Sequence, residues 1–116
     1  MLVAIEHMHS QGVFHRDIKP ENVMFRNPDE IVLTDFGLAD FYRKDGSYLF
    51  TNCGTPGYCA PELLLNKAYD LKVDIYSVGI VLYQMLCGQI PFNSDDYNTR
   101  VKLNKQGLID WSVVPV

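Results

Sequence analysis

The segment His15-Arg16-Asp17-Ile18-Lys19-Pro20-Glu21-Asn22 stands directly before a predicted β-hairpin, and the organisation of the chain can be worked out from it. Within this short stretch lie a carboxylate at Asp17, a primary amine at Lys19 and a carboxamide at Asn22. Proline within the segment disfavours a continuous helix. We therefore expect a loop that presents three polar side chains of different chemistry.

Two β-favouring runs follow this loop, Val23-Met24-Phe25 and Ile31-Val32-Leu33. The turn-rich tetrapeptide Asn27-Pro28-Asp29-Glu30 separates them, so we predict an antiparallel hairpin with a four-residue loop. A hairpin brings the residue before its first strand beside the residue after its second strand. Asn22 and Asp35 are therefore expected close together, at the open end of the hairpin.

The residue types at this end of the hairpin suit phosphoryl transfer. Asn22 and Asp35 offer the hard oxygen ligands that magnesium prefers when substrate phosphates complete its shell. Asp17 can orient a hydroxyl group and accept its proton, and Lys19 can stabilise a transferring phosphoryl group. Taken alone, Asp and Asn at loop ends are more often turn formers than catalytic groups.

Further motifs decide between these readings, because together they resemble eukaryotic protein kinases. Residues 15–22 are similar to the catalytic loop of that family, and the other motifs follow in the family's order: Asp35-Phe36-Gly37, Gly54-Thr55-Pro56-Gly57-Tyr58, Ala60-Pro61-Glu62, and Asp74 with Gly79. A single such motif has little specificity, whereas the ordered set has a great deal.

The resemblance implies ATP and magnesium as cofactors and assigns roles to individual residues. Asp17 is the implied catalytic base, with Lys19 and Asn22 completing the catalytic set. Asn22 and Asp35 are the implied magnesium ligands. The implied cofactor-binding residues are Lys19, Glu21, Asn22, Met24 and Asp35.

Three other roles follow from the resemblance and concern packing. Met24 and Val81 occupy positions similar to those of the family's column of packed apolar side chains below the adenine. His15 and Phe36 occupy positions similar to those of a second column of packed side chains. Asp74 is similar to a buried aspartate that holds the backbone of the catalytic loop. A plain helix N-terminal anion is a compatible reading of Asp74.

The form of the motifs also bears on the substrate. HRDIKPEN and the threonine in GTPGY resemble serine/threonine kinases rather than tyrosine kinases. Glu21, Thr55 and Pro56 are the implied substrate-binding residues, with Glu21 at a position that recognises a basic residue of the substrate. Gln84 stands where some kinases with that preference carry a second glutamate, which argues against a strong arginine preference.

The segments GTPGYCAPE and CGQIPF look most similar to the calcium/calmodulin-dependent kinase group. This similarity implies protein substrates and ATP as partners. Regulation by calcium/calmodulin in a longer parent protein is a further expectation.

Thr51 aligns with the family's activating phosphothreonine, and Arg16 is its implied partner. A phosphate adds about −1.5 to −2 charge and would couple loop order to the neighbouring catalytic aspartate. Asp40 departs from the pattern, because related kinases often carry a second basic residue there; Arg43 or Lys44 could replace it. The simpler reading of Thr51 is an exposed loop threonine.

Composition supports a globular chain. Of its 116 residues 47% are hydrophobic and 21% are charged, and the formal net charge is -4. This balance argues against a nucleic-acid or anionic-membrane partner. The apolar stretch 75–92 is broken by polar residues, Gly and Pro, so a buried helix is favoured over a membrane span. Three cysteines without CxxC spacing and no visible signal peptide favour a cytoplasmic protein.

The predicted fold class is α+β, mainly helical: a partial C-terminal lobe of a protein-kinase-like fold with a short β-hairpin beside the catalytic loop. Helices are expected before Gly12 and over residues 61–65, 74–86 and 100–106. The whole chain, 1–116, is expected to be a partial catalytic domain, from the catalytic loop to the central helix. We expect the N-terminal lobe, with its glycine-rich loop and strand lysine, and the last helices of the C-terminal lobe to be absent from this sequence.

Three functions remain open at this stage. The first is ATP-dependent phosphorylation of serine or threonine in proteins, with little or no activity expected of this chain alone. The second is a non-catalytic kinase-like binding or scaffold module, and the third a small-molecule phosphotransferase. The exposed apolar helix of an incomplete lobe also predicts a poorly soluble or molten isolated chain.

Overall fold

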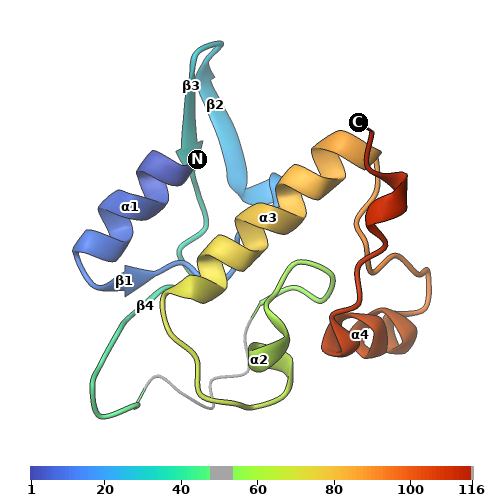
Figure 1. Cartoon of the computed structure of the whole chain (residues 1–116). Coiled ribbons are helices and arrows are strands. Elements are labelled where there is room, and N and C mark those ends of the chain that lie inside the picture. Colours follow the sequence, from blue (N-terminus) through green and yellow to red (C-terminus); the bar gives the residue numbers. More distant parts are fainter. Residues whose placement is uncertain (48–53, 116) are drawn as a thin grey trace.

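Helix α3 (Lys72–Cys87) runs through the centre of the molecule, and the other elements are arranged around it (Figure 1). In the computed structural model, which describes residues 1–47 and 54–115, α1 and the hairpin lie to one side of α3 and α4 to the other (Figure 1). The helix ends at Gly88, whose φ of 77° is the left-handed conformation that glycine adopts without steric cost. The predicted helix 74–86 is confirmed and extends slightly further at both ends.

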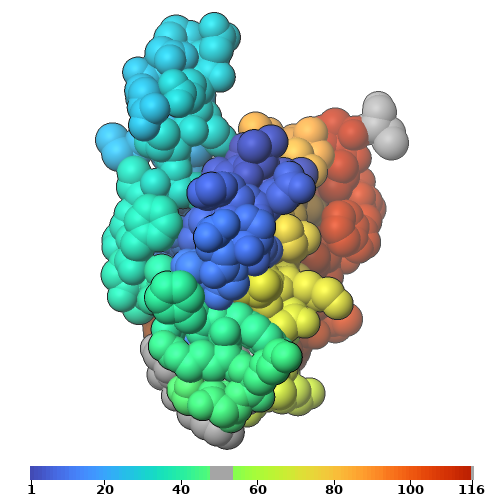
Figure 2. All heavy atoms as spheres, turned by 90° about the vertical axis from the view of Figure 1, so that its left-hand side faces the viewer, coloured from blue at the N-terminus to red at the C-terminus, as the bar shows by residue number. Residues whose placement is uncertain are grey.

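Helix α1 (Leu2–Ser10) packs against α3 and the catalytic-loop segment through one buried side chain, Ile5. Ile5, Ile18 and Val81 form a buried cluster in which each side chain is at most 5% exposed. Figure 2 shows α1 on the surface, between the base of the hairpin and α3. Through Ile18, the loop 15–22 is thus held against α1 and α3 by apolar contacts.

A hairpin formed by β2 (Val23–Asn27) and β3 (Glu30–Leu33) projects from the body of the molecule (Figures 1 and 2). The pairing is antiparallel, with Val23 opposite Leu33, as predicted. The predicted four-residue loop is wrong, because Asn27 pairs with Glu30 and only two residues connect the strands. The Asn27 carboxamide explains the tighter turn: it accepts the Asp29 N–H at 3.0 Å and donates to the Glu30 carboxylate at 3.1 Å.

A second buried cluster joins the loop segments to α2 (Pro61–Leu64) and to the start of α3. Phe14, Ala60, Leu63 and Val73 lie at its centre, each at most 4% exposed. Helix α4 (Tyr97–Gln106) packs against α2. It begins three residues before the predicted start at Arg100, because Asp96 caps it by accepting the Thr99 N–H at 2.8 Å.

Some short elements were not predicted. Strand β1 (Val13–Phe14) pairs antiparallel with β4 (Asp40–Phe41), and two single-turn 3-10 helices, η1 (Pro20–Asn22) and η2 (Trp111–Val113), complete the described residues. The helices and two separate two-stranded sheets agree with the predicted α+β class.

The apolar stretch 75–92 suggested a buried helix, but one part of the surface of α3 is exposed. Ile75, Leu82, Met85 and Leu86 are 47–74% exposed. Within the described part of the chain, no helix has both the length and the apolar character needed to cross a membrane.

Candidate active site

Asp74 anchors the loop that carries the predicted catalytic residues. Its carboxylate is 1% exposed and accepts the backbone N–H groups of His15 at 2.9 Å and Arg16 at 2.8 Å. The ring Nε2 of His9 lies 2.9 Å from the same carboxylate. These contacts hold Arg16 at a φ of 68°, a left-handed conformation that a non-glycine residue adopts only at a cost. The inferred loop-holding contact of Asp74 is present.

The structure brings Asp17 and Asn22 together. The Asn22 Nδ2 group donates to the Asp17 carbonyl oxygen at 2.8 Å and to its carboxylate Oδ2 at 3.3 Å. Asn22 is 5% exposed and lies at the end of η1. Since its N–H donors are directed at Asp17, the Asn22 Oδ1 atom is left as the side-chain group able to bind a cation.

Thr55 completes a hydrogen-bonded trio with the two predicted catalytic residues on the loop. Its hydroxyl donates to Asp17 Oδ1 at 2.7 Å and accepts from Lys19 Nζ at 3.0 Å. Lys19 Nζ itself lies 3.9 Å from Asp17 Oδ2. Sequence reasoning placed Thr55 among the substrate-binding residues only. Thr55 and Asp17 are 38 positions apart in the sequence, so no local sequence pattern predicts their contact.

Asp35 follows β3 at the open end of the hairpin, where Asn22 precedes β2. The Thr34 N–H donates to the Asn22 carbonyl oxygen at 2.9 Å, which holds the two chain segments side by side as predicted. Asp35 is exposed and has a φ of 57°. One of its carboxylate oxygens accepts the Gly37 N–H at 3.2 Å. The carboxylate thus faces solvent at the same end of the hairpin as Asn22.

The packed contact predicted between His15 and Phe36 is present. The two rings lie edge to face, with centroids 5.1 Å apart. His15 is fully buried and its Nε2 lies 2.8 Å from the Thr34 carbonyl oxygen, while its Nδ1 accepts the Asp17 N–H at 3.1 Å. One imidazole therefore joins the catalytic loop to the segment that carries Asp35.

Asn22 and Asp35 are suited to magnesium held jointly with phosphate groups. Among residues 1–47 and 54–115, no three His, Cys, Asp or Glu side chains cluster in a way that could hold a metal ion. Magnesium sites commonly use one or two protein carboxylates together with substrate phosphates. The open Asn22 Oδ1 atom and the exposed Asp35 carboxylate fit that pattern.

Glu21 lines a cavity of about 360 Å³ together with Lys19 and Thr55. Tyr58, Gln84 and Arg100 also line this cavity. Within it the Tyr58 hydroxyl donates to Gln84 Oε1 at 2.8 Å, and burial raises the Tyr58 pKa above its ordinary value. The cavity combines one carboxylate with two basic side chains and three carboxamides, those of Gln84, Gln89 and Asn93.

Of the other predicted binding residues, Pro56 is half-buried directly after Thr55. Met24 is 56% exposed on β2. Val81, its inferred companion below the adenine, is buried on α3 against Ile5 and Ile18. The structure does not bury Met24 with Val81.

Thr51, the predicted regulatory residue, lies outside the described residues. Arg16, its inferred partner, is buried, and its guanidinium donates to the Leu38 carbonyl oxygen at 2.8 Å and to the Tyr69 hydroxyl at 3.0 Å. Asp40 Oδ2 lies 3.8 Å from Arg16 Nη2. The Arg43 guanidinium, 2.7 Å from the Asp40 carboxylate, lowers the Asp40 pKa below its ordinary value.

The chain belongs to the protein kinase family, because a profile of the protein kinase domain matches residues 1–114. The family expected from the motifs is therefore confirmed. Several relatives are named as serine/threonine-protein kinases or as calcium/calmodulin-dependent protein kinases.

Calcium/calmodulin-dependent protein kinase type 1 of Macrobrachium nipponense is 46% identical over 99 residues, which cover 83% of this chain and 28% of the relative. Serine/threonine-protein kinase cds1 of Schizosaccharomyces pombe is 46% identical over 113 residues, or 92% and 25% of the two chains. CBL-interacting serine/threonine-protein kinase 2 of Arabidopsis thaliana is 44% identical over 115 residues, or 96% and 25%. The chain spans about a quarter of the length of these relatives.

Proposed function

We propose that this chain carries the catalytic loop of an ATP-dependent protein serine/threonine kinase. The observation that supports this most directly is the environment of Asp17. Its two carboxylate oxygens receive hydrogen bonds from Thr55 and Asn22, and Lys19 lies within 3.9 Å. A carboxylate held at a fixed place beside a cation is what positioning of a hydroxyl nucleophile requires.

Each residue has a separate task in this proposal. Asp17 orients the serine or threonine hydroxyl of the protein substrate and accepts its proton as the oxygen bonds to the γ-phosphorus and the bond to the ADP oxygen breaks. Lys19 offsets charge on the transferring group. Asn22 and Asp35 would hold magnesium, which when bound supplies charge neutralisation on the ATP phosphates.

The cavity beside Glu21 is the proposed contact site for the substrate chain, with Thr55 in its lining and Pro56 next in the sequence. Glu21 would bind a basic substrate side chain by charge. Because Gln84 is neutral and Arg100 is cationic in the same cavity, we propose only a weak preference for arginine.

Met24 and Glu21 complete the proposed ATP-binding set with Lys19, Asn22 and Asp35. We further propose a cytoplasmic protein, and regulation by calcium/calmodulin in a longer parent protein, on the strength of similarity to kinases with that name. No feature of the described residues favours the non-catalytic alternative.

Substitution of Asp17 tests the catalytic proposal. In the full-length native protein that contains this chain, Asp17→Asn is expected to lower phosphoryl transfer to a peptide by about 10²–10⁴-fold, because it removes the proton acceptor and keeps the size of the side chain. The measurement is transfer of labelled γ-phosphate from ATP. Asp29→Asn, at the exposed hairpin tip, is the matched control and should retain full activity. Equal rates for the two variants would exclude Asp17 as the base.

Phosphorylation of Thr51 is proposed as an activating modification that pairs with Arg16. Thr51→Ala is expected to lower activity of the full-length protein, since the phosphate would no longer order the segment beside Arg16. Phosphopeptide mapping together with kinase assay measures this. Full activity of protein shown to be unmodified at Thr51 would contradict the proposal.

A further inference from the structure

Helix α4 buries one carboxamide completely, although most of the helix is polar and exposed. Asn104 is 0% exposed. Its Oδ1 accepts the Gly57 N–H at 2.7 Å and lies 3.6 Å from the Cys59 thiol, and its Nδ2 donates to the Cys59 carbonyl oxygen at 2.9 Å. Both ends of the amide therefore bind the backbone of a loop more than 40 positions away in sequence.

The chemistry of this contact is selective for asparagine. A buried backbone N–H or carbonyl oxygen without a partner is costly, so the loop needs an acceptor and a donor at the same point. An aspartate at position 104 would supply the acceptor alone, and a leucine of similar volume would supply neither.

The loop that Asn104 binds, residues 57–59, is connected to Thr55 by two further hydrogen bonds. The Thr55 carbonyl oxygen accepts the Tyr58 N–H at 3.0 Å and the Cys59 N–H at 3.2 Å. The hydroxyl of the same Thr55 contacts Asp17 and Lys19. A continuous path of hydrogen bonds thus leads from α4 through the loop to the proposed catalytic groups.

The loop is also confined on its other side. Gly57 has a φ of 102°, and a Cβ atom there would lie 2.7 Å from Ile90 Cδ1. Because only glycine allows this close approach, the Gly57 backbone is held between Ile90 and Asn104. Small shifts of Asn104 would be passed to Thr55 rather than absorbed locally.

We propose that Asn104 is a positioning residue that sets the place of Thr55, and through it the places of Asp17 and Lys19. This inference rests on the proposed kinase function for its effect on catalysis. Its effect on the geometry of Lys19 can be measured without any activity.

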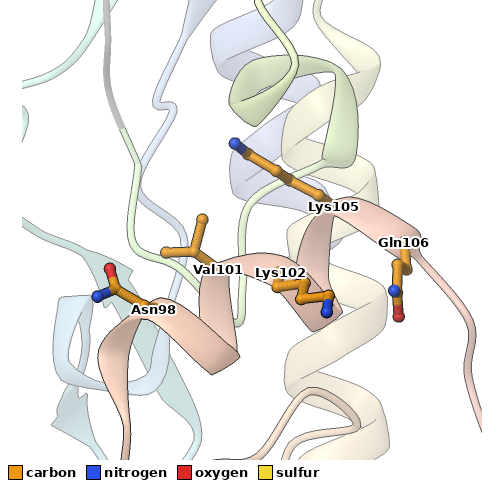
Figure 3. Close-up of a pocket in the computed structure, with 5 residues that line it drawn as sticks. All are labelled: Asn98, Val101, Lys102, Lys105 and Gln106. Atoms are coloured by element: carbon orange, nitrogen blue, oxygen red, sulfur yellow. The ribbon is translucent and has the colours of Figure 1, made fainter.

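The exposed face of the same helix supplies controls. Figure 3 shows Asn98, Val101, Lys102, Lys105 and Gln106, which line an open cavity of about 350 Å³ on α4. Asn98 is an exposed asparagine, so Asn98→Leu is the matched control for Asn104→Leu. Lys102 and Lys105 are exposed reference amines for the partly covered amine of Lys19.

The test compares Asn104→Leu, Asn104→Asp and Asn98→Leu with the unaltered full-length protein, each as the folded monomer collected by gel filtration. Acetic anhydride labels the lysines, and mass spectrometry gives the rate at Lys19 relative to Lys102. The proposal expects this ratio to rise severalfold in both Asn104 variants, because Lys19 loses its fixed hydrogen bond to Thr55, and to stay constant in Asn98→Leu. An unchanged ratio in the Asn104 variants would overturn it.

Steady-state kinetics give a second readout. Both Asn104 variants are expected to lose about 10- to 100-fold in kcat/KM for the peptide, with a raised KM for the peptide and, because Lys19 belongs to the proposed ATP-binding set, for ATP. A smaller folded fraction alone would lower kcat and leave both KM values as they were, which would contradict a positioning role. If neither variant yields a folded monomer, Asn104 is a folding residue and the proposal is wrong.

The two proposals fail separately. An inactive unaltered protein in which the Asn104 variants still raise the Lys19 ratio would reject the kinase function and retain the positioning role. If the unaltered protein is active and both Asn104 variants behave as Asn98→Leu does, the kinase function is retained and the positioning role is rejected.

Discussion

Thr55 has two neighbours of opposite charge, and its hydroxyl serves both. It donates to the Asp17 carboxylate and accepts from the Lys19 ammonium group. Lys19 Nζ and Asp17 Oδ2 lie 3.9 Å apart, too far for a hydrogen bond, so the Thr55 hydroxyl links the two charged groups. A threonine hydroxyl can both donate and accept, which an apolar side chain cannot.

Removal of that hydroxyl is therefore predicted to impair catalysis in the full-length protein. Thr55→Val keeps the shape of the side chain and should lower kcat for peptide phosphorylation by about 10- to 100-fold, since it misplaces Asp17 and Lys19. Thr55→Ser, which keeps the oxygen, should retain most of the activity. Steady-state kinetics at saturating ATP measure both, and a fully active valine variant would show that the hydroxyl is dispensable.

The individual residues differ in how far the sequence could predict them. Asp17, Asn22 and Asp35 lie in recognisable motifs, and the structure places them at one end of the hairpin. Asn104 lies in a helix without such a motif. Its partners are 45 and 47 positions away, and only the folded chain brings them within hydrogen-bonding distance.

Among the elements, α4 depends on the cap at its N-terminus. Asp96 accepts the N–H and the hydroxyl of Thr99, at 2.8 Å and 2.6 Å. These bonds favour the charged carboxylate, so the side chain and backbone of Thr99 lower the Asp96 pKa below the ordinary value of 3.8. The start of α4 is thus sensitive to acid.

This cap predicts a pH dependence with a definite sign. A lowered folded-state pKa gives stability that is present above pH 3.8 and is lost as pH falls through the folded-state value. Amide exchange at Thr99 should therefore be faster in Asp96→Ala than in the unaltered protein near neutral pH. The difference should shrink once the pH falls below the folded-state pKa. Asp95→Ala, one residue earlier and exposed, is the control; a difference that persists undiminished in strong acid would contradict the cap's ionic character.

Helices with clear apolar periodicity were predictable as elements, and their ends were less so. The start of α4 was missed because the cap Asp96 precedes a run of polar residues with little periodicity. The β1–β4 pair was missed for a different reason. Each strand has two residues, too few to show alternation, and the pairing joins Val13 to Phe41 and Phe14 to Asp40, far apart in the sequence.

The molecule as a whole leaves much apolar surface uncovered. Leu82, Met85 and Leu86 on α3 are at least half exposed, and an apolar cavity of about 430 Å³ lies between α3 and the start of α1. The radius of gyration is 14.4 Å. A compact domain of this length has roughly 13 Å. The difference agrees with the projecting hairpin and an incompletely covered helix.

The 116-residue chain expressed alone is predicted to be molten or poorly soluble. Exposed apolar surface on α3 should bind a hydrophobic dye such as ANS, and thermal unfolding should be broad. Calorimetry and dye fluorescence measure this. Leu82→Lys with Met85→Lys is expected to reduce dye binding, whereas Lys102→Glu on α4 is expected to leave it unchanged. A sharp, cooperative transition of the monomer would contradict the prediction.

The contact between Asp74 and the catalytic loop also sets an order of events during synthesis. His15 and its partner Asp74 are 59 positions apart. At the usual rate of translation, a ribosome needs roughly 3–12 s to add that length of chain. During that interval the nascent loop has its charged residues but lacks the buried carboxylate that fixes its backbone. Helix α3 must therefore emerge from the ribosome before the polypeptide can order the loop that was made first.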